Sequence, residues 1–176
     1  MVKRVCLLTG ILIAVLIPAA WILCSDEAGA DSPVRAEAGA GSPLRAEADL
    51  DGDGNMEEYL LSRHNLTVRE AGQELWQSPE DWTVDHFVIG DADNDGTDNL
   101  TISLWKTGSF GEVRPFWMTE EDTGYKNHLF LYRLEENAFR PIWCSSDLDC
   151  PIVSYEIRDA DGDGMNELVV QEGKYR

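Results

Sequence analysis

Three stretches of the sequence carry an aspartate at every second position and then a glycine. They begin at Asp49, Asp91 and Asp159, read DLDGDGNME, DADNDGTDN and DADGDGMNE, and align without a gap. Carboxylates spaced this densely repel one another, so solvent or a bound cation must neutralise them. A solvated acidic turn can arise once by accident, but three copies with the same spacing indicate a common role.

Calcium explains the spacing, because the ion takes roughly six to eight oxygen ligands. Alternate residues of a tight loop point their carboxylates inward, and the glycine at position 6 supplies the positive φ that the turn requires. Position 9 adds a fourth side chain, whereas position 7 contributes its backbone carbonyl. The sequence therefore predicts two to three Ca²⁺ ions. The predicted ligands are Asp49, Asp51, Asp53, Asn55 and Glu57 in the first stretch, Asp91, Asp93, Asp95, Thr97 and Asn99 in the second, and Asp159, Asp161, Asp163, Met165 and Glu167 in the third.

The middle stretch carries the neutral Asn99 at position 9, where the other two carry Glu57 and Glu167. Because the number of charged ligands tunes calcium affinity, the middle site is predicted to be the weakest. Asn99 also begins an Asn-Leu-Thr glycosylation sequon, and a glycan there would contradict its role as a ligand.

An EF-hand is the obvious competing interpretation, and position 12 argues against it. The EF-hand loop needs a bidentate glutamate there, at the start of a helix. This chain has Leu60, Ile102 and Val170 at position 12, within apolar or alternating runs typical of strands. A dockerin-type loop fails on the same residues, so each acidic loop is predicted to lead into a strand.

The net charge of -19 makes nucleic acid an unsuitable partner, because neutralising phosphates requires a basic surface. Thirteen of the 33 acidic residues lie in or beside the three loops, so much of the charge imbalance belongs to the predicted metal sites.

The N-terminus is predicted to be a targeting segment covering residues 1–24. Lys3 and Arg4 precede an uncharged apolar stretch, residues 5–23, which places the remainder of the chain outside the cytoplasm. Two fates stay open. The Ala28-Gly29-Ala30 sequence suits cleavage of a signal peptide, whereas the length of the apolar stretch suits an uncleaved membrane helix.

Residues 25–47 are predicted to be a disordered linker. AGADSPVRAE (28–37) recurs as AGAGSPLRAE (38–47), and neither copy has an apolar face with which to order itself. The duplication would serve as a tether, or it is a replication product on which nothing depends.

Residues 48–176 are predicted to form one all-β domain. The stretches ELWQSPEDWTVDHFVIGDADNDG and PIWCSSDLDCPIVSYEIRDADGDG match in order, aligning Trp76 with Trp143 and Ser78 with Ser145. These two tryptophans and Trp105 fall at strand-periodic positions and are predicted to be core. Strands are predicted over 58–63, 66–70, 73–77, 83–90, 99–105, 128–134, 138–144, 152–158 and 167–173.

The aspartate-rich loops set between apolar strands resemble the FG-GAP/VCBS repeat, the blade unit of integrin alpha-subunit β-propellers and of many exported bacterial proteins. The resemblance covers residues 48–176 and rests on the loops beginning at 49, 91 and 159, since the Phe-Gly and Gly-Ala-Pro signatures of the family are not evident. It implies antiparallel four-stranded blades in which the loop joins the first two strands and binds Ca²⁺. Propellers close with 4 to 8 blades, so this length implies an open or partial propeller of about two blades plus a hairpin, unless self-association completes a ring.

Two cysteines, Cys144 and Cys150, fall in the predicted domain, and Cys6 and Cys24 in the targeting segment. Outside the cytoplasm a Cys144–Cys150 disulfide is one expectation, and two thiols are the alternative.

The interval between the second and third loops contains an insertion, residues 106–127, that carries Phe110, Phe116, Trp117 and Tyr125. Long loops on rigid scaffolds often carry binding, and exposed aromatic residues often anchor partners. The alternative is that Phe116 and Trp117 fold back over a sheet edge.

Taken together, these features favour an exported or membrane-tethered, non-catalytic Ca²⁺-binding scaffold for adhesion, with an extracellular protein or glycan as partner. Two other classes compete with it. An accessory domain of an enzyme, or a hydrolase that uses the acidic loops, would need a base or an open metal site, and His64, His86 and His128 are scattered along the chain. An extracellular Ca²⁺ sensor would need a fold that responds to changes in calcium.

Overall fold

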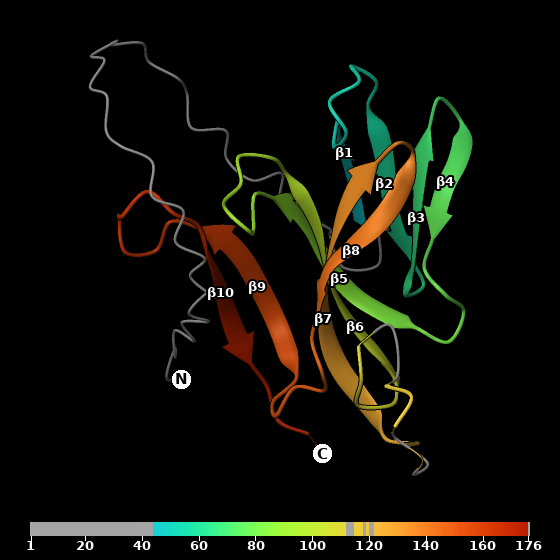
Figure 1. Cartoon of the computed structure of the whole chain (residues 1–176), viewed down its shortest axis with the longest axis vertical. Coiled ribbons are helices and arrows are strands. Elements are labelled where there is room, and N and C mark those ends of the chain that lie inside the picture. The colour runs from blue at the N-terminus through green and yellow to red at the C-terminus, as the bar shows by residue number, and fades with distance from the viewer. Residues whose placement is uncertain (1–43, 112–114, 118, 120–121, 176) are drawn as a thin grey trace.

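The computed structural model describes residues 44–111, 115–117, 119 and 122–175 (Figure 1). The predicted targeting segment and residues 25–43 of the predicted linker lie outside the described residues. The described part is all-β with antiparallel sheets. It contains no helix, and therefore no helical segment able to cross a membrane.

Ten strands form three sheets, ordered β1-β2-β3-β4, β5-β6-β7-β8 and β10-β9. Each strand pairs with the next along the chain within its sheet, so each sheet is a simple meander. The strands are β1 (Leu44–Ala48), β2 (Glu57–Ser62), β3 (Asn65–Glu70), β4 (Gln73–Gln77), β5 (Thr83–Gly90), β6 (Asn99–Thr107), β7 (Tyr125–Glu135), β8 (Ala138–Cys144), β9 (Ile152–Arg158) and β10 (Glu167–Glu172).

Each of the nine predicted strands corresponds to one of β2 to β10, with the largest difference at the start of β7. The tenth strand, β1, begins inside the segment that the sequence assigned to the linker, so the linker prediction was wrong for residues 44–47. Leu44, Ala46 and Ala48 alternate with exposed neighbours and are buried against β2. The second decapeptide copy thus supplies an apolar face that becomes evident only when β2 lies beside it.

The second sheet lies between the other two and is covered on both faces (Figure 1). On one face Phe87 and Ile89 of β5 pack with residues of the first sheet. On the other, Val88 packs with Tyr155 and Ile157 of β9. Successive residues of a strand point to opposite faces, so a strand buried on both sides reads as a continuous apolar run. The run VIG before the second acidic loop has this character.

Ser78 and Ser145 close the first and second sheets in the same way. The backbone N–H of Leu66 donates to Ser78 Oγ at 3.1 Å, and that of Leu129 donates to Ser145 Oγ at 2.9 Å. Both hydroxyls are buried, and each serine N–H donates in return to the carbonyl of the same leucine. In each four-stranded sheet, the serine that follows the fourth strand therefore accepts a hydrogen bond from a backbone N–H of the third strand. That N–H lies near the start of β3 in the first sheet and in the middle of β7 in the second.

Replacing Ser145 with Ala is expected to lower the free energy of unfolding by about 1 to 3 kcal/mol, because the buried Leu129 N–H loses its acceptor. Urea unfolding of the full-length chain measures this effect. Ser154→Ala is the matched control, since its hydroxyl forms only an exposed hydrogen bond of 3.4 Å to Gln171. Equal effects of the two substitutions would contradict the role given to Ser145.

The structure decides between the two alternatives for the cysteines and corrects the prediction for Trp143. Cys144 and Cys150 are thiols and form no disulfide. Cys144 instead packs against Gly111, so closely that a Cβ on Gly111 would lie 2.9 Å from Cys144 Cβ. Trp76 packs on the core beside Tyr132, but its counterpart Trp143 is 44% exposed, because it lies on the edge strand β8, where most side chains face solvent.

Candidate metal centres

Each acidic stretch connects two neighbouring antiparallel strands. Loop 1 (residues 49–56) joins β1 to β2, loop 2 (91–98) joins β5 to β6, and loop 3 (159–166) joins β9 to β10. Loops 1 and 2 therefore connect the first two strands of a four-stranded sheet. Loop 3 connects the two strands of the third sheet.

The three loops share one backbone conformation. Position 4 has positive φ in all of them, at 72° for Gly52, 60° for Asn94 and 84° for Gly162. Position 6 is a glycine with φ between 87° and 90°. The N–H of that glycine donates to Oδ2 of the first aspartate at 2.9 to 3.0 Å in every loop. The common spacing in the sequence thus produces a common fold of the loop.

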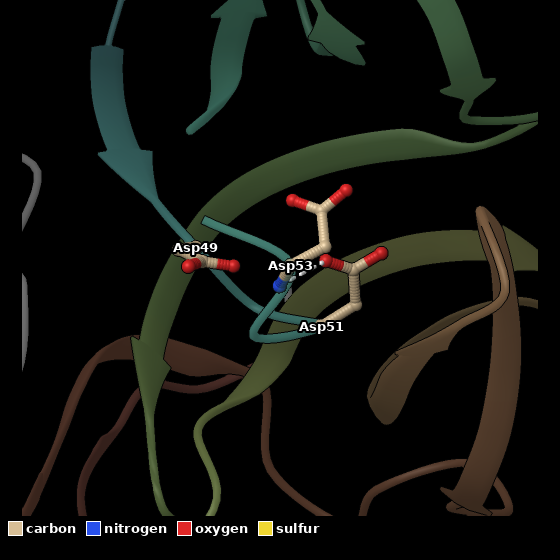
Figure 2. Close-up of side chains that lie close together, drawn as sticks. All are labelled: Asp49, Asp51 and Asp53. Atoms are coloured by element: carbon tan, nitrogen blue, oxygen red, sulfur yellow. Dashed lines mark hydrogen bonds between the residues drawn. The ribbon is translucent and has the colours of Figure 1, made fainter. Parts of the chain in front are cut away.

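The alternating aspartates bring their carboxylates together. Oxygens of Asp49, Asp51 and Asp53 lie within 4.8 Å of one another, and Figure 2 shows these three side chains around loop 1. The corresponding set in loop 2 is Asp91, Asp93 and Asp95, and in loop 3 it is Asp159, Asp161 and Glu167. Asp163 lies outside the loop 3 set, although it accepts the N–H of position 7 at 2.9 Å, as Asp53 and Asp95 do in their loops.

The side chain at position 7 varies between the loops. Asn55 donates through Nδ2 to Asp53, Thr97 donates through its hydroxyl to Asp95, and Met165 is 52% exposed. The Thr97 hydroxyl is the largest influence that holds the pKa of Asp95 below its ordinary value. The side chains of Asn55 and Thr97 therefore both contact the aspartate at position 5. The backbone N–H of position 7 donates to that aspartate in all three loops.

The side chain at position 9 braces its loop by turning back toward position 2. Glu57 Oε2 accepts the Leu50 N–H at 2.8 Å, and Glu167 Oε2 accepts the Ala160 N–H at 2.7 Å. In loop 2 the acceptor is Asn99 Oδ1, which lies 3.2 Å from the Ala92 nitrogen. Asn99 is fully buried, and a glycan cannot be attached to it in this fold. The sequence placed these residues in the site but did not reveal this second contact.

The remaining carboxylate oxygen of Glu57, Oε1, is buried and has no hydrogen-bond partner. The residue as a whole is fully buried. Burial raises the pKa of this carboxyl, with smaller contributions from the charges of Asp51 and Asp49. An unpaired buried carboxylate is costly. A cation that prefers oxygen ligands, such as Ca²⁺, would neutralise the Glu57 carboxylate. The residues of loop 1 therefore fit a calcium ion.

In loop 2 the atom that corresponds to Glu57 Oε1 is Asn99 Nδ2, which is a hydrogen-bond donor and not an acceptor. With Asn99 Oδ1 occupied by the Ala92 N–H, the buried Nδ2 of Asn99 has no hydrogen-bond partner. An amide NH₂ group is a donor only and cannot ligate a cation. Loop 2 thus offers at position 9 only the Asn99 Oδ1 atom, which already accepts the Ala92 N–H.

Arg133 of β7 reaches into loop 2. Its Nη2 atom lies 3.0 Å from Asp93 Oδ2 and also contacts Asp95 Oδ2. Burial raises the pKa of Asp93, the charge of Asp95 raises it further, and the charge of Arg133 opposes both effects. Sequence reasoning missed Arg133, because it lies 38 residues after Asp95 and only the pairing of β6 with β7 brings it to the loop.

Loops 2 and 3 are joined directly. The Asn166 N–H donates to Asn94 Oδ1 at 2.6 Å, and Asn94 Nδ2 donates back to the Asn166 carbonyl at 3.1 Å. Asn166 Nδ2 also donates to the Asp91 carbonyl at 2.9 Å. In loop 3 the N–H groups of Gly164 and Gly162 lower the pKa of Asp159 and favour its ionised form. Loop 2 carries Asn94 at position 4, where loops 1 and 3 carry a glycine, and this difference is the sequence signal for the junction.

A search among family models, curated proteins and solved structures finds no match for the chain. The fold and the loops define a class, namely an all-β protein with clustered aspartates at the connections between paired antiparallel strands.

Proposed function

We propose that this chain is an exported or membrane-tethered calcium-binding β module that holds a protein or glycan partner without catalysing a reaction. The observation that carries the proposal is the fully buried Glu57, whose Oε1 atom has no hydrogen-bond partner, in a loop whose three aspartates bring carboxylate oxygens within 4.8 Å of one another. Hard oxygen donors at this density suit Ca²⁺ better than softer metals, which prefer nitrogen or sulfur.

Calcium would act as a structural ion in this proposal. In loop 1 it would be held by Asp49, Asp51, Asp53, Glu57 and the carbonyl of Asn55. Its charge would neutralise the carboxylates, and its ligands would fix the crossing from β1 to β2. Loop 3 would do the same for β9 and β10 through Asp159, Asp161, Asp163 and Glu167. Extracellular calcium is abundant, which favours permanently filled sites over a sensor.

The proposed architecture of the chain is that of the FG-GAP/VCBS repeats, which its acidic loops resemble. Two features support it: loops 1 and 2 each connect the first two strands of a four-stranded antiparallel sheet, and the three loops share their backbone conformation. On this proposal the first two sheets are blades, and β9 with β10 is a further hairpin of an open or partial propeller.

The partner-binding surface is proposed to include Phe116 and Trp117 of the 106–127 insertion. Phe116 is 92% exposed and Trp117 67% exposed, and their rings meet edge to face at 5.0 Å. This exposure argues against the alternative that the two side chains fold back over a sheet edge. Exposed aromatic pairs supply large contact areas at little entropic cost, which suits recognition of proteins and sugars.

Replacing both aromatic residues with serine is expected to weaken partner binding at least about tenfold, since each buried aromatic anchor contributes more than about 1 kcal/mol to an interface. The measurement is binding of the labelled full-length chain to a glycan array and to intact cells, in excess calcium and in excess chelator. Val153→Ser is the control, because Val153 is an apolar residue that is 61% exposed elsewhere on the surface. Calcium-dependent binding that the double variant leaves unchanged would contradict the proposed surface.

A further inference from the structure

One position on the third strand of each four-stranded sheet faces position 9 of the acidic loop. In the first sheet Glu57 lies directly opposite Glu70 of β3. In the second sheet Leu100 lies opposite Tyr132, and extending that register by one residue brings Asn99 opposite Arg133. Equivalent places beside the two loops are therefore occupied by a carboxylate in one sheet and by a guanidinium in the other.

Beside loop 1 no residue of the described part of the chain forms an ion pair with the negative charge. Residues directly opposite on antiparallel strands have Cβ atoms about 4.5 to 5.5 Å apart, and like charges there are destabilising. Glu57 and Glu70 both have a buried Oε1 atom without a hydrogen-bond partner. Among the ion pairs of the described residues, none involves a carboxylate of loop 1 or of loop 3.

Beside loop 2 the counterion is part of the chain. Arg133 contacts Asp93 and Asp95, two of the three carboxylates that would ligate an ion in this loop, and a third carboxylate, Glu135, lies 3.9 Å from its Nη1 atom. The Arg133 side chain is only 31% exposed. The guanidinium thus lies where a bound metal would meet the same oxygens, and the buried amide nitrogen of Asn99 adds no ligand.

We propose that Arg133 replaces a metal ion in loop 2, so that this loop binds no calcium, whereas loop 1 binds a calcium ion with Glu70 as an additional carboxylate beside it. The statement about loop 1 rests on the proposed function, and the statement about loop 2 does not. Because its cation is covalently attached, loop 2 keeps its conformation at any calcium concentration. It therefore holds Asn94 in place for the hydrogen bonds to Asn166 of loop 3.

Counting the bound ions tests the proposal directly. Native mass spectrometry and calorimetric titration of the full-length chain in detergent, with CaCl₂ as the only added divalent salt, are expected to give two ions per chain. Asn99→Glu combined with Arg133→Gln restores an acid at position 9 and removes the internal cation, and is expected to give three ions. Arg69→Gln is the control, since Arg69 only approaches Glu74 at 4.0 Å on the surface, and it stays at two. Three ions in the wild type, or two in the double variant, would overturn the proposal.

A second measurement separates this proposal from the proposed function. In excess chelator, Arg133→Gln is expected to lower the melting temperature at least about 3 °C more than Arg69→Gln, because the carboxylates of loop 2 lose their counterion without a metal to replace it. Equal shifts for the two variants would overturn the role of Arg133. If the wild type binds no calcium at all, the proposed function fails and this comparison alone decides whether Arg133 neutralises loop 2.

Discussion

Removing calcium is expected to lower the melting temperature of the full-length chain by about 15 °C or more. An ion that binds only the folded state adds about 2.7 kcal/mol when its free concentration is about 100-fold above its Kd, so two ions add roughly 5 kcal/mol. For a domain of this size each kcal/mol corresponds to a few degrees. Differential scanning calorimetry in excess calcium and in excess chelator measures the shift.

Magnesium provides the control for this result. Mg²⁺ prefers a small octahedral site and gives up its water molecules reluctantly, so it should restore much less stability than Ca²⁺ at the same concentration. A melting temperature that is the same in calcium and in chelator would contradict the calcium sites, because an ion that binds only the folded state must stabilise it. Equal rescue by magnesium would also contradict them, because it indicates general screening of the acidic loops.

Glu57→Gln is expected to have opposite effects with and without calcium. In excess calcium it should lower the free energy of unfolding by about 2 to 3 kcal/mol, because loop 1 loses a charged ligand and with it much of the binding of one ion. In chelator it should be neutral or stabilising, because a neutral amide replaces a buried carboxylate that faces Glu70 and the loop aspartates. Chemical unfolding of wild type and variant under both conditions measures the change of sign.

Glu58→Gln is the matched control for this experiment. Glu58 is the next residue of β2, so its side chain is on the opposite face of the sheet, where it is exposed and lies across from Arg69. The substitution removes the same charge from the chain but leaves loop 1 intact. If Glu58→Gln reproduces the calcium-dependent reversal, the effect comes from net charge and not from a site at Glu57.

The strands were accessible from the sequence because their side chains alternate in burial and their ends are marked by turn residues. β2 and β9 show this alternation in the structure, and the acidic loops fix where β6 and β10 begin. β1 was missed because Leu44, Ala46 and Ala48 are a weak apolar pattern inside an alanine-rich duplication. The burial of Trp143 was predicted wrongly because local periodicity does not reveal which strand lies at the edge of its sheet.

The loops were predictable to the level of their backbone, since aspartate spacing and glycine placement are local properties. The differences between the three loops were not predictable from the sequence. The contact of Arg133 with loop 2 depends on the register between β6 and β7, and the position of Glu70 depends on that between β2 and β3. Register emerges from packing of the whole sheet, so a cation or carboxylate that arrives from a distant strand is invisible in a motif of nine residues.

The most direct test of the central claim is to locate the ions. Crystals of the protein grown with calcium, and with a lanthanide as a strongly scattering substitute, would show anomalous density at each occupied site. The account predicts one peak among Asp49, Asp51, Asp53 and Glu57 of loop 1, a second in loop 3, and the Arg133 guanidinium without a peak in loop 2. Density maps with no peak in loop 1 or loop 3 at saturating metal would contradict the claim that these loops are calcium sites.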